Sequence, residues 1–100
     1  GVGKKLIALE TLTLIADTPL NVKIIGSEKP ATIDEIREIS SWLFTKPTSG
    51  KAKGVVIDNA DEMRGEAANA LLKTLEEPPE YGYIVLVAKS EQSVLPTLRS

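Results

Sequence analysis

Hydrophobic and polar positions alternate in blocks that predict the order helix, strand, helix, strand, helix, strand. The helices are expected over residues 6–15, 33–44 and 66–77, and the strands over residues 22–25, 54–57 and 83–88. Strands that are separated by helices pair in parallel through right-handed crossovers. The expected fold class is therefore α/β, a three-layer sandwich in which helices cover both faces of a small parallel sheet.

The two later strands are expected to be central strands of this sheet. Residues 54–57 read GVVI and residues 83–88 read YIVLVA, so polar residues do not alternate with apolar ones in either run. Continuous apolar runs of this length are typical of parallel strands that are buried on both faces.

Local signals define the second and third helices. Thr32 followed by Glu35 fits a capping box at the start of the second helix. Trp42 recurs at helical spacing with the apolar residues of that helix, so we expect it in the core rather than on a ligand-binding surface. The apolar face of the third helix is expected to consist of Ala68, Leu71, Leu72 and Leu75.

A polar segment separates the second helix from the strand at residues 54–57. Residues 45–53 read TKPTSGKAK and carry Pro47, Gly50 and 3 lysines. We expect a solvated loop here, and a contact with DNA phosphates is the alternative.

Composition narrows the class of protein. The 100 residues are 42% hydrophobic and 26% charged, which is typical of one globular domain. The net charge of −2 gives no global basic field of the kind that marks nucleic-acid-binding domains. The chain has neither Cys nor His, which excludes disulfides and Cys-based zinc sites. No run has the length of a membrane span, so a cytoplasmic location is the default expectation.

The first candidate functional residue lies directly after the predicted strand at residues 54–57. In open α/β sheets, ligands bind beyond the carboxyl ends of the strands, and Asp58 follows this strand directly. An Asp at this position holds Mg²⁺ in the Walker B motif of P-loop NTPases. The alternative is that Asp58 only starts a turn or caps the next helix.

The first residues offer a second candidate. Gly3 and Lys4 could be the last Gly and the Lys of a P-loop, Gly-x-x-x-x-Gly-Lys-Ser/Thr, before the first helix. Lys5 then stands where the pattern has a Mg²⁺-binding hydroxyl. The alternative is an ordinary basic segment ahead of a helix.

Two further segments carry a resemblance to a known family. Residues 58–63, DNADEM, and residues 66–80, EAANALLKTLEEPPE, resemble bacterial clamp-loader subunits, the gamma/tau and delta-prime AAA+ proteins of DNA polymerase III. Residues 33–39 and 95–100 are similar to other parts of these proteins. The resemblance implies a partial RecA-like AAA+ core over residues 1–100, a single truncated domain without the family's first strand, zinc module, lid and collar domains.

Departures from the family pattern point to one kind of subunit. Asn59 stands where active members have the Walker B Glu, and an amide cannot take a proton from the attacking water. Lys89 and Ser90 fall at the sensor position, where the family usually has Thr or Asn. Together with Lys5, these changes imply a delta-prime-like module without ATPase activity of its own. An active gamma/tau-like ATPase and a structural remnant with neither role are the alternatives.

The resemblance also implies partners. Ser100 matches the Ser of the family's Ser-Arg-Cys motif, whose Arg is the finger that enters a neighbouring subunit's ATP site. The expected partners are the gamma/tau and delta subunits and, through the complex, the sliding clamp and primed DNA. Whether Mg-ATP still binds is left open, and no zinc is expected.

Overall fold

The computed structural model describes residues 2–88, which form three helices and three strands in the predicted order. The elements are α1 (Val2–Ala16), β1 (Val22–Ile25), α2 (Ile33–Phe44), β2 (Lys53–Ile57), α3 (Gly65–Glu76) and β3 (Gly82–Leu86). Two short 3-10 helices, Pro19–Asn21 and Ala60–Glu62, lie in the connections. The first helix begins earlier than predicted, so Lys4 and Lys5 lie within α1 rather than before it.

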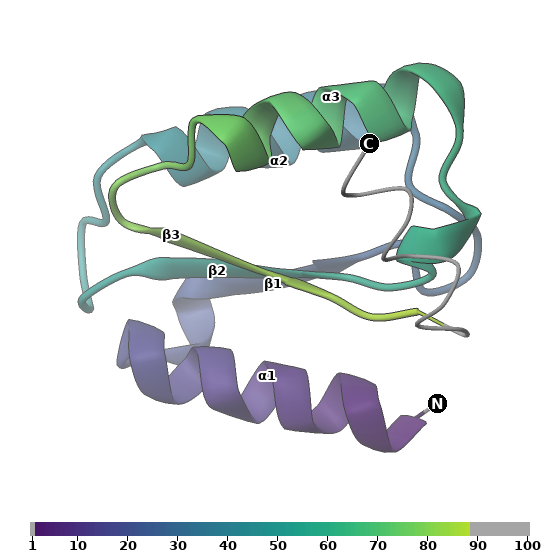
Figure 1. Ribbon diagram of the computed structural model, residues 1–100. Helices are drawn as coiled ribbons and strands as arrows, with labels where there is room; N and C mark the ends of the chain where they lie inside the picture. The colour runs from purple at the N-terminus through teal and green to yellow at the C-terminus, as the bar shows by residue number, and fades with distance from the viewer. Residues whose placement is uncertain (1, 89–100) are drawn as a thin grey trace.

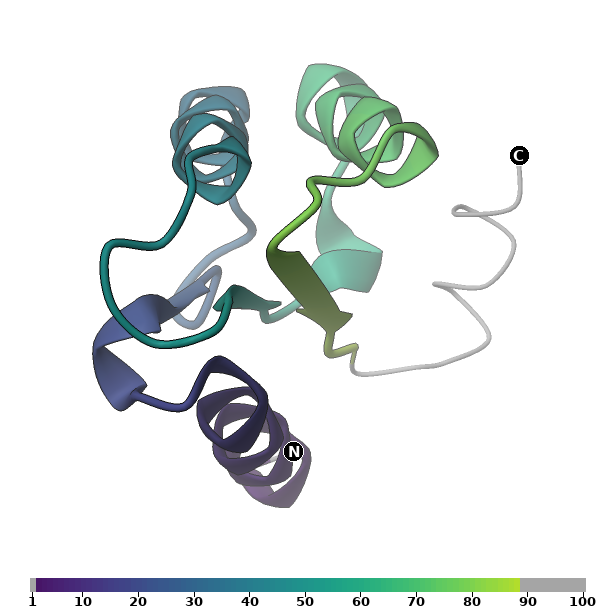
Figure 2. The ribbon, with the colours of Figure 1, turned by 90° about the vertical axis from the view of Figure 1, so that its left-hand side faces the viewer.

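The strands form one parallel sheet with helices on both faces. The strand order is β1-β2-β3, with Ile25 paired to Ile57 and Ile57 to Leu86. Figures 1 and 2 show α2 and α3 side by side on one face and α1 alone on the other. This arrangement confirms the predicted three-layer α/β sandwich with a parallel sheet.

Only one of the two strands predicted to be central has that position among the described strands. All residues of β2 are buried and it pairs with β1 on one side and with β3 on the other. Within residues 2–88, β3 pairs only with β2, and Tyr83 is 47% exposed, so the described residues do not show β3 as a central strand. A run of apolar residues reports that both faces of a strand are covered, but it carries no signal for whether both edges are paired.

The larger part of the core lies between the sheet and the pair α2 and α3. Its most deeply buried members are Ile36 and Leu43 of α2 and Val55 and Ile57 of β2. A smaller cluster lies under α1 and consists of Ala8, Leu12, Val56 and Val87. Each fully buried aliphatic side chain contributes roughly 1.5–3 kcal/mol, so the layer of α2 and α3 dominates the stability of the sheet.

The starts of α2 and α3 differ, and the predicted capping box of α2 is confirmed. Thr32 and Glu35 form the capping box of α2, since each side chain accepts a hydrogen bond from the other residue's backbone N–H. The α3 start at Gly65 has φ 58, and Arg64 before it makes no side-chain capping bond. On α3 the predicted apolar face is confirmed at Leu71, which is buried, and at Ala68 and Leu75, which are half-buried and pack against the core. Ala67 and Thr74 are also buried, which the sequence did not predict.

Trp42 packs against the main core cluster, as predicted, and two lysines lie over its ring. The ammonium of Lys23 is 4.5 Å and that of Lys53 is 5.0 Å from the ring centroid. Lys53 is only 7% exposed and donates to the carbonyl oxygen of Trp42 at 2.9 Å and to Thr45 Oγ1. Assigning Lys53 to a solvated loop was therefore wrong, and its ammonium is not available to a DNA phosphate.

The loop before β2 is anchored to the end of α1 and to the 3-10 helix that follows it. The side-chain amide of Asn21 donates to the carbonyl oxygen of Ser49 at 2.6 Å, and the N–H of Lys51 donates to the carbonyl oxygen of Ala16 at 2.9 Å. These bonds fix the loop at the amino end of β2, opposite to Asp58.

Among the helices within residues 2–88, none is long and apolar enough to cross a lipid bilayer.

Candidate functional site

The candidate site lies at the carboxyl ends of β1 and β2. Because the strands are parallel and in register, Gly26 after β1 and Asp58 after β2 lie at the same edge of the sheet. The N–H of Asp58 donates to the carbonyl oxygen of Ile25 at 2.8 Å, and the N–H of Val87 donates to that of Ile57 at 2.9 Å. These backbone bonds continue the ladder past the strand ends, so the backbone at Ile57 and Asp58 is held from both neighbouring segments.

Each oxygen of the Asp58 carboxylate has a partner in this chain. Its Oδ2 lies 3.5 Å from the ammonium of Lys5 in α1, and its Oδ1 accepts a hydrogen bond from the N–H of Asn59 at 2.9 Å. The described contacts of Asp58 do not include a cap on α3. The side chain thus combines a local turn contact with an ion pair to α1.

Asn59 ties the ends of two strands together. Its backbone is in the left-handed region at φ 53 and ψ 37, a conformation that Asn tolerates better than most residues. Its side-chain amide donates to the carbonyl oxygen of Gly26 at 2.7 Å and lies 3.4 Å from that of Ser27. The NH₂ group therefore has a structural task, and the residue has no group that could act as a base.

Gly26 is required by the close approach of the two chain segments. A Cβ at this position would lie 2.4 Å from the carbonyl oxygen of Asp58, and the residue has φ 83. Both facts exclude a larger residue without movement of the backbone. The carboxyl ends of β1 and β2 are thus locked by Gly26 and Asn59 together.

The predicted P-loop residues lie in the first turns of α1. Lys4 is exposed, whereas Lys5 is turned toward the sheet and reaches Asp58. A Cβ on Gly3 would meet nothing within 4 Å, so the described contacts do not require a glycine there. The structure brings Lys5, Asp58 and Asn59 together, and leaves Gly3 and Lys4 apart from them. Lys89, Ser90 and Ser100 lie outside the described residues.

The donor set at this edge does not fit a divalent metal ion. Mg²⁺ takes oxygen ligands, usually one or two carboxylates with substrate phosphates and water. Asp58 could supply such a carboxylate, but its Oδ2 is paired with the Lys5 ammonium, so a divalent ion would compete with a positive charge that is already in place.

Comparison with known proteins decides the family. A family model described as DNA polymerase III, delta subunit, matches residues 10–100. The chain belongs to this family. The predicted resemblance to the clamp-loader subunits of DNA polymerase III is confirmed.

Relatives of both expected kinds are similar to the chain. DNA polymerase III subunit delta' of Yersinia pestis is 43% identical over 68 residues, 68% of this chain and 20% of the relative. The delta' subunit of Pseudomonas aeruginosa is 35% identical over 74% of this chain and 23% of the relative. The gamma/tau subunit of Mycobacterium tuberculosis is 34% identical over 68% of this chain and 12% of the relative. The chain thus spans about a fifth to a quarter of the delta' relatives' length.

A solved clamp-loader relative has the same fold. The crystal structure of a DNA polymerase III gamma subunit-related protein from Thermotoga maritima matches with a TM-score of 0.81 and 35% identity. The match covers 95% of this chain and 33% of the other. The α/β fold is therefore that of a partial AAA+ core, as the sequence resemblance implies.

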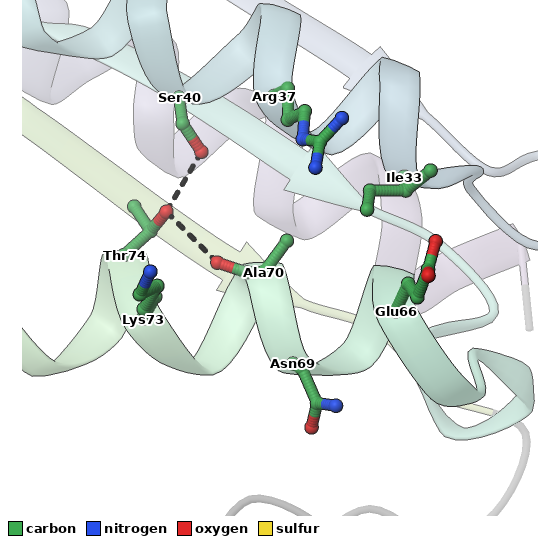
Figure 3. A pocket seen from close by; sticks show the side chains of 8 residues that line it. All are labelled: Ile33, Arg37, Ser40, Glu66, Asn69, Ala70, Lys73 and Thr74. Carbon is green, nitrogen blue, oxygen red and sulfur yellow. Dashed lines mark hydrogen bonds between the residues drawn. The ribbon is translucent and has the colours of Figure 1, made fainter.

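A groove lies between α2 and α3, on the face of the sheet away from α1 (Figure 1). The sequence resemblance did not predict it. The groove has a volume of about 540 Å³, and Figure 3 shows Ser40 and Thr74 pointing toward one another across it. Their hydroxyl oxygens are 2.8 Å apart, and Thr74 donates to the carbonyl oxygen of Ala70 at 3.2 Å, so Ser40 is the donor between them. Thr74 was not expected in the core, because a buried Thr that is satisfied by its own helix leaves no pattern in the sequence.

Proposed function

We propose that this chain is the core of a delta-prime-like, non-hydrolysing subunit of the DNA polymerase III clamp loader. In that role it assembles with gamma/tau and delta subunits in the cytoplasm and helps to load the sliding clamp on primed DNA. The proposal rests on the family, and on one observation above the others. Asn59 occupies the predicted Walker B Glu position. Its side-chain amide donates a hydrogen bond to the carbonyl oxygen of Gly26, and the residue has no group that could accept a proton from water.

The chemistry of ATP hydrolysis supports this choice. The attacking water must be oriented and must lose a proton, and a missing general base typically lowers the rate by about 10²–10⁴-fold. Rotating the side chain of Asn59 would not supply the base, and it would break the bond to Gly26. The ammonium of Lys5 on Asp58 further disfavours a Mg²⁺-nucleotide complex at this edge.

The alternative is an active gamma/tau-like ATPase. It is favoured by the Asp that follows β2, at the predicted Walker B position, and by the similarity to gamma/tau subunits. An active subunit would need Asp58 to release Lys5 when Mg-ATP binds.

The test compares Asp58→Asn with the unchanged protein in a clamp-loader complex reconstituted with gamma/tau and delta subunits. Asn at position 58 keeps an acceptor for the N–H of Asn59 but carries no charge for Mg²⁺. We expect the ATP hydrolysis rate of the complex to stay within about twofold, because the hydrolysing sites belong to other subunits. A large loss of hydrolysis on Asp58→Asn would overturn the proposal in favour of the active ATPase. Failure of the protein to enter the complex would overturn the clamp-loader role itself.

A further inference from the structure

Lys5 is placed as a core-facing residue of α1 and not as a free surface lysine. Ala8, Leu12 and Ala16 are the buried residues of this helix, and Lys5 precedes Ala8 by three positions on the same stripe. Its stem therefore runs along the side of the helix that packs on the sheet. Its side chain is 30% exposed, and that of its partner Asp58 is 17% exposed.

We propose that the Lys5 ammonium is a tethered cation that takes the place of a divalent metal ion at the carboxyl end of β2. Asp58 then serves as the anchor of α1 on the sheet, and the Lys5 charge weakens the binding of Mg²⁺ at this edge. The inference deepens the proposed function at the same site. It rests on the ion pair between Lys5 of α1 and Asp58 after β2. It can be wrong even if the chain does not hydrolyse ATP.

The division of the Asp58 oxygens supports this assignment. Oδ1 accepts a hydrogen bond from the N–H of Asn59 and Oδ2 is paired with Lys5, so a metal ion would share either oxygen with a group that is already in place. The neighbouring position offers no second carboxylate, because residue 59 is an amide whose NH₂ is bound to Gly26. Mg²⁺ gives up its water reluctantly and needs several oxygen ligands, which one shared carboxylate does not provide.

Charge repulsion adds to this lack of ligands. An ammonium and a dication about 4 Å apart repel one another, which lowers the association constant roughly thirty-fold even with the dielectric constant of water. Partial burial of both side chains makes the screening weaker than in bulk water and the repulsion larger. The positive charge of Lys5 thus lowers the affinity of this edge for a divalent metal ion.

The anchor also has a structural reason. The cluster beneath α1 is small, with Ala8 and Leu12 of the helix packed on Val56 and Val87. The ion pair lies one turn before Ala8 and fastens the amino-terminal part of α1 to the end of β2. A metal ion would hold Asp58 but would leave this part of α1 without its contact to the sheet.

The test uses the isotope-labelled 100-residue chain and Mn²⁺ as the probe. Mn²⁺ broadens the NMR signals of nearby amides, so the signals of Ile57, Asp58 and Asn59 report binding at this edge. The variants are Lys5→Thr, which removes the cation and adds a hydroxyl, and Lys5→Arg, which keeps the cation. Lys4→Thr is the matched control, because Lys4 is the exposed neighbour in the same helix.

We expect Lys5→Thr to reach half-maximal broadening at roughly thirty-fold lower Mn²⁺ concentration than the unchanged chain. Lys5→Arg and Lys4→Thr should behave like the unchanged chain. Lys5→Met, which keeps an unbranched stem without the charge, replaces Lys5→Thr if that variant does not fold.

Two results would overturn the inference. One is site-specific broadening in the unchanged chain as strong as in the variant without the cation. The other is no gain of Mn²⁺ binding in a folded variant that lacks the Lys5 charge. Both leave the hydrolysis experiment on the reconstituted complex intact, so failure of the tethered cation and failure of the proposed function are distinguishable.

Discussion

Placing a carboxylate at the predicted Walker B Glu position with Asn59→Glu should destabilise the chain and should not create an ATPase. The side-chain amide of Asn59 donates to the carbonyl oxygen of Gly26 at 2.7 Å, and a carboxylate cannot donate there. Leaving a buried acceptor without its donor costs about 1–3 kcal/mol. Gly26 is buried and the contact is partly buried, so we expect a value near the middle of this range.

The backbone adds a second term. Residue 59 has φ 53, where Asn is tolerated and an ordinary L-residue is disfavoured by roughly 1 kcal/mol. The carboxylate would also point toward the carbonyl oxygens of Gly26 and Ser27, which are negative ends of peptide dipoles. The expected loss in the free energy of unfolding is therefore about 2–4 kcal/mol.

Urea unfolding followed by far-UV circular dichroism measures this loss. With a slope of about 1–2 kcal/mol per molar urea for a domain of this size, the midpoint should fall by roughly 1–4 M. Asn59→Gly is the first control, because it keeps the left-handed backbone and removes only the hydrogen bond. Asn59→Asp is the second, because it adds the charge in a side chain that tolerates this conformation. The reasoning is refuted if Asn59→Glu is as stable as the unchanged chain, or if it hydrolyses ATP.

Three further substitutions test the described contacts by thermal or urea unfolding. Gly26→Ala should cost at least about 2 kcal/mol, because its Cβ would lie 2.4 Å from the Asp58 carbonyl oxygen; an unchanged midpoint would contradict the close approach. Thr32→Ala should cost about 1 kcal/mol through loss of the capping box, and Thr32→Ser, which keeps the acceptor, should recover most of it. Thr74→Val should cost about 1–2 kcal/mol by removing the hydroxyl pair with Ser40, and a double-mutant cycle with Ser40→Ala should show coupling; additive losses would contradict the pairing.

Much of the fold follows from patterns that are local in the sequence. The run at residues 54–57 is apolar without alternation because both faces of β2 are covered, and the structure buries every residue of that strand. The capping box of α2 was predictable because both of its partners lie within one helical turn. The position of Asp58 at the sheet edge follows from the end of its strand.

The features that periodicity could not reveal depend on contacts between distant segments. The pairing of Lys5 with Asp58 joins α1 to the end of β2, and the bond from Asn59 to Gly26 joins the ends of two strands. Neither contact can be predicted from the residue type or the local sequence pattern at either of its two positions. Lys53 was misassigned because composition suggests a solvated lysine, whereas its stem is buried and its ammonium binds a carbonyl oxygen and lies over an aromatic ring.

The position of Trp42, with the ammonium groups of Lys23 and Lys53 over its ring, has a consequence for the fluorescence of the protein. Trp42 is the chain's single tryptophan, so the intrinsic indole emission comes from this one place. It lies beside the start of β2, while Asp58 follows the other end of that strand. Emission should therefore remain constant when cations or nucleotides are added at the Asp58 edge and should change when the amino end of the sheet opens. The tryptophan emission spectrum can thus distinguish ligand binding at the Asp58 edge from unfolding, without an added fluorescent label.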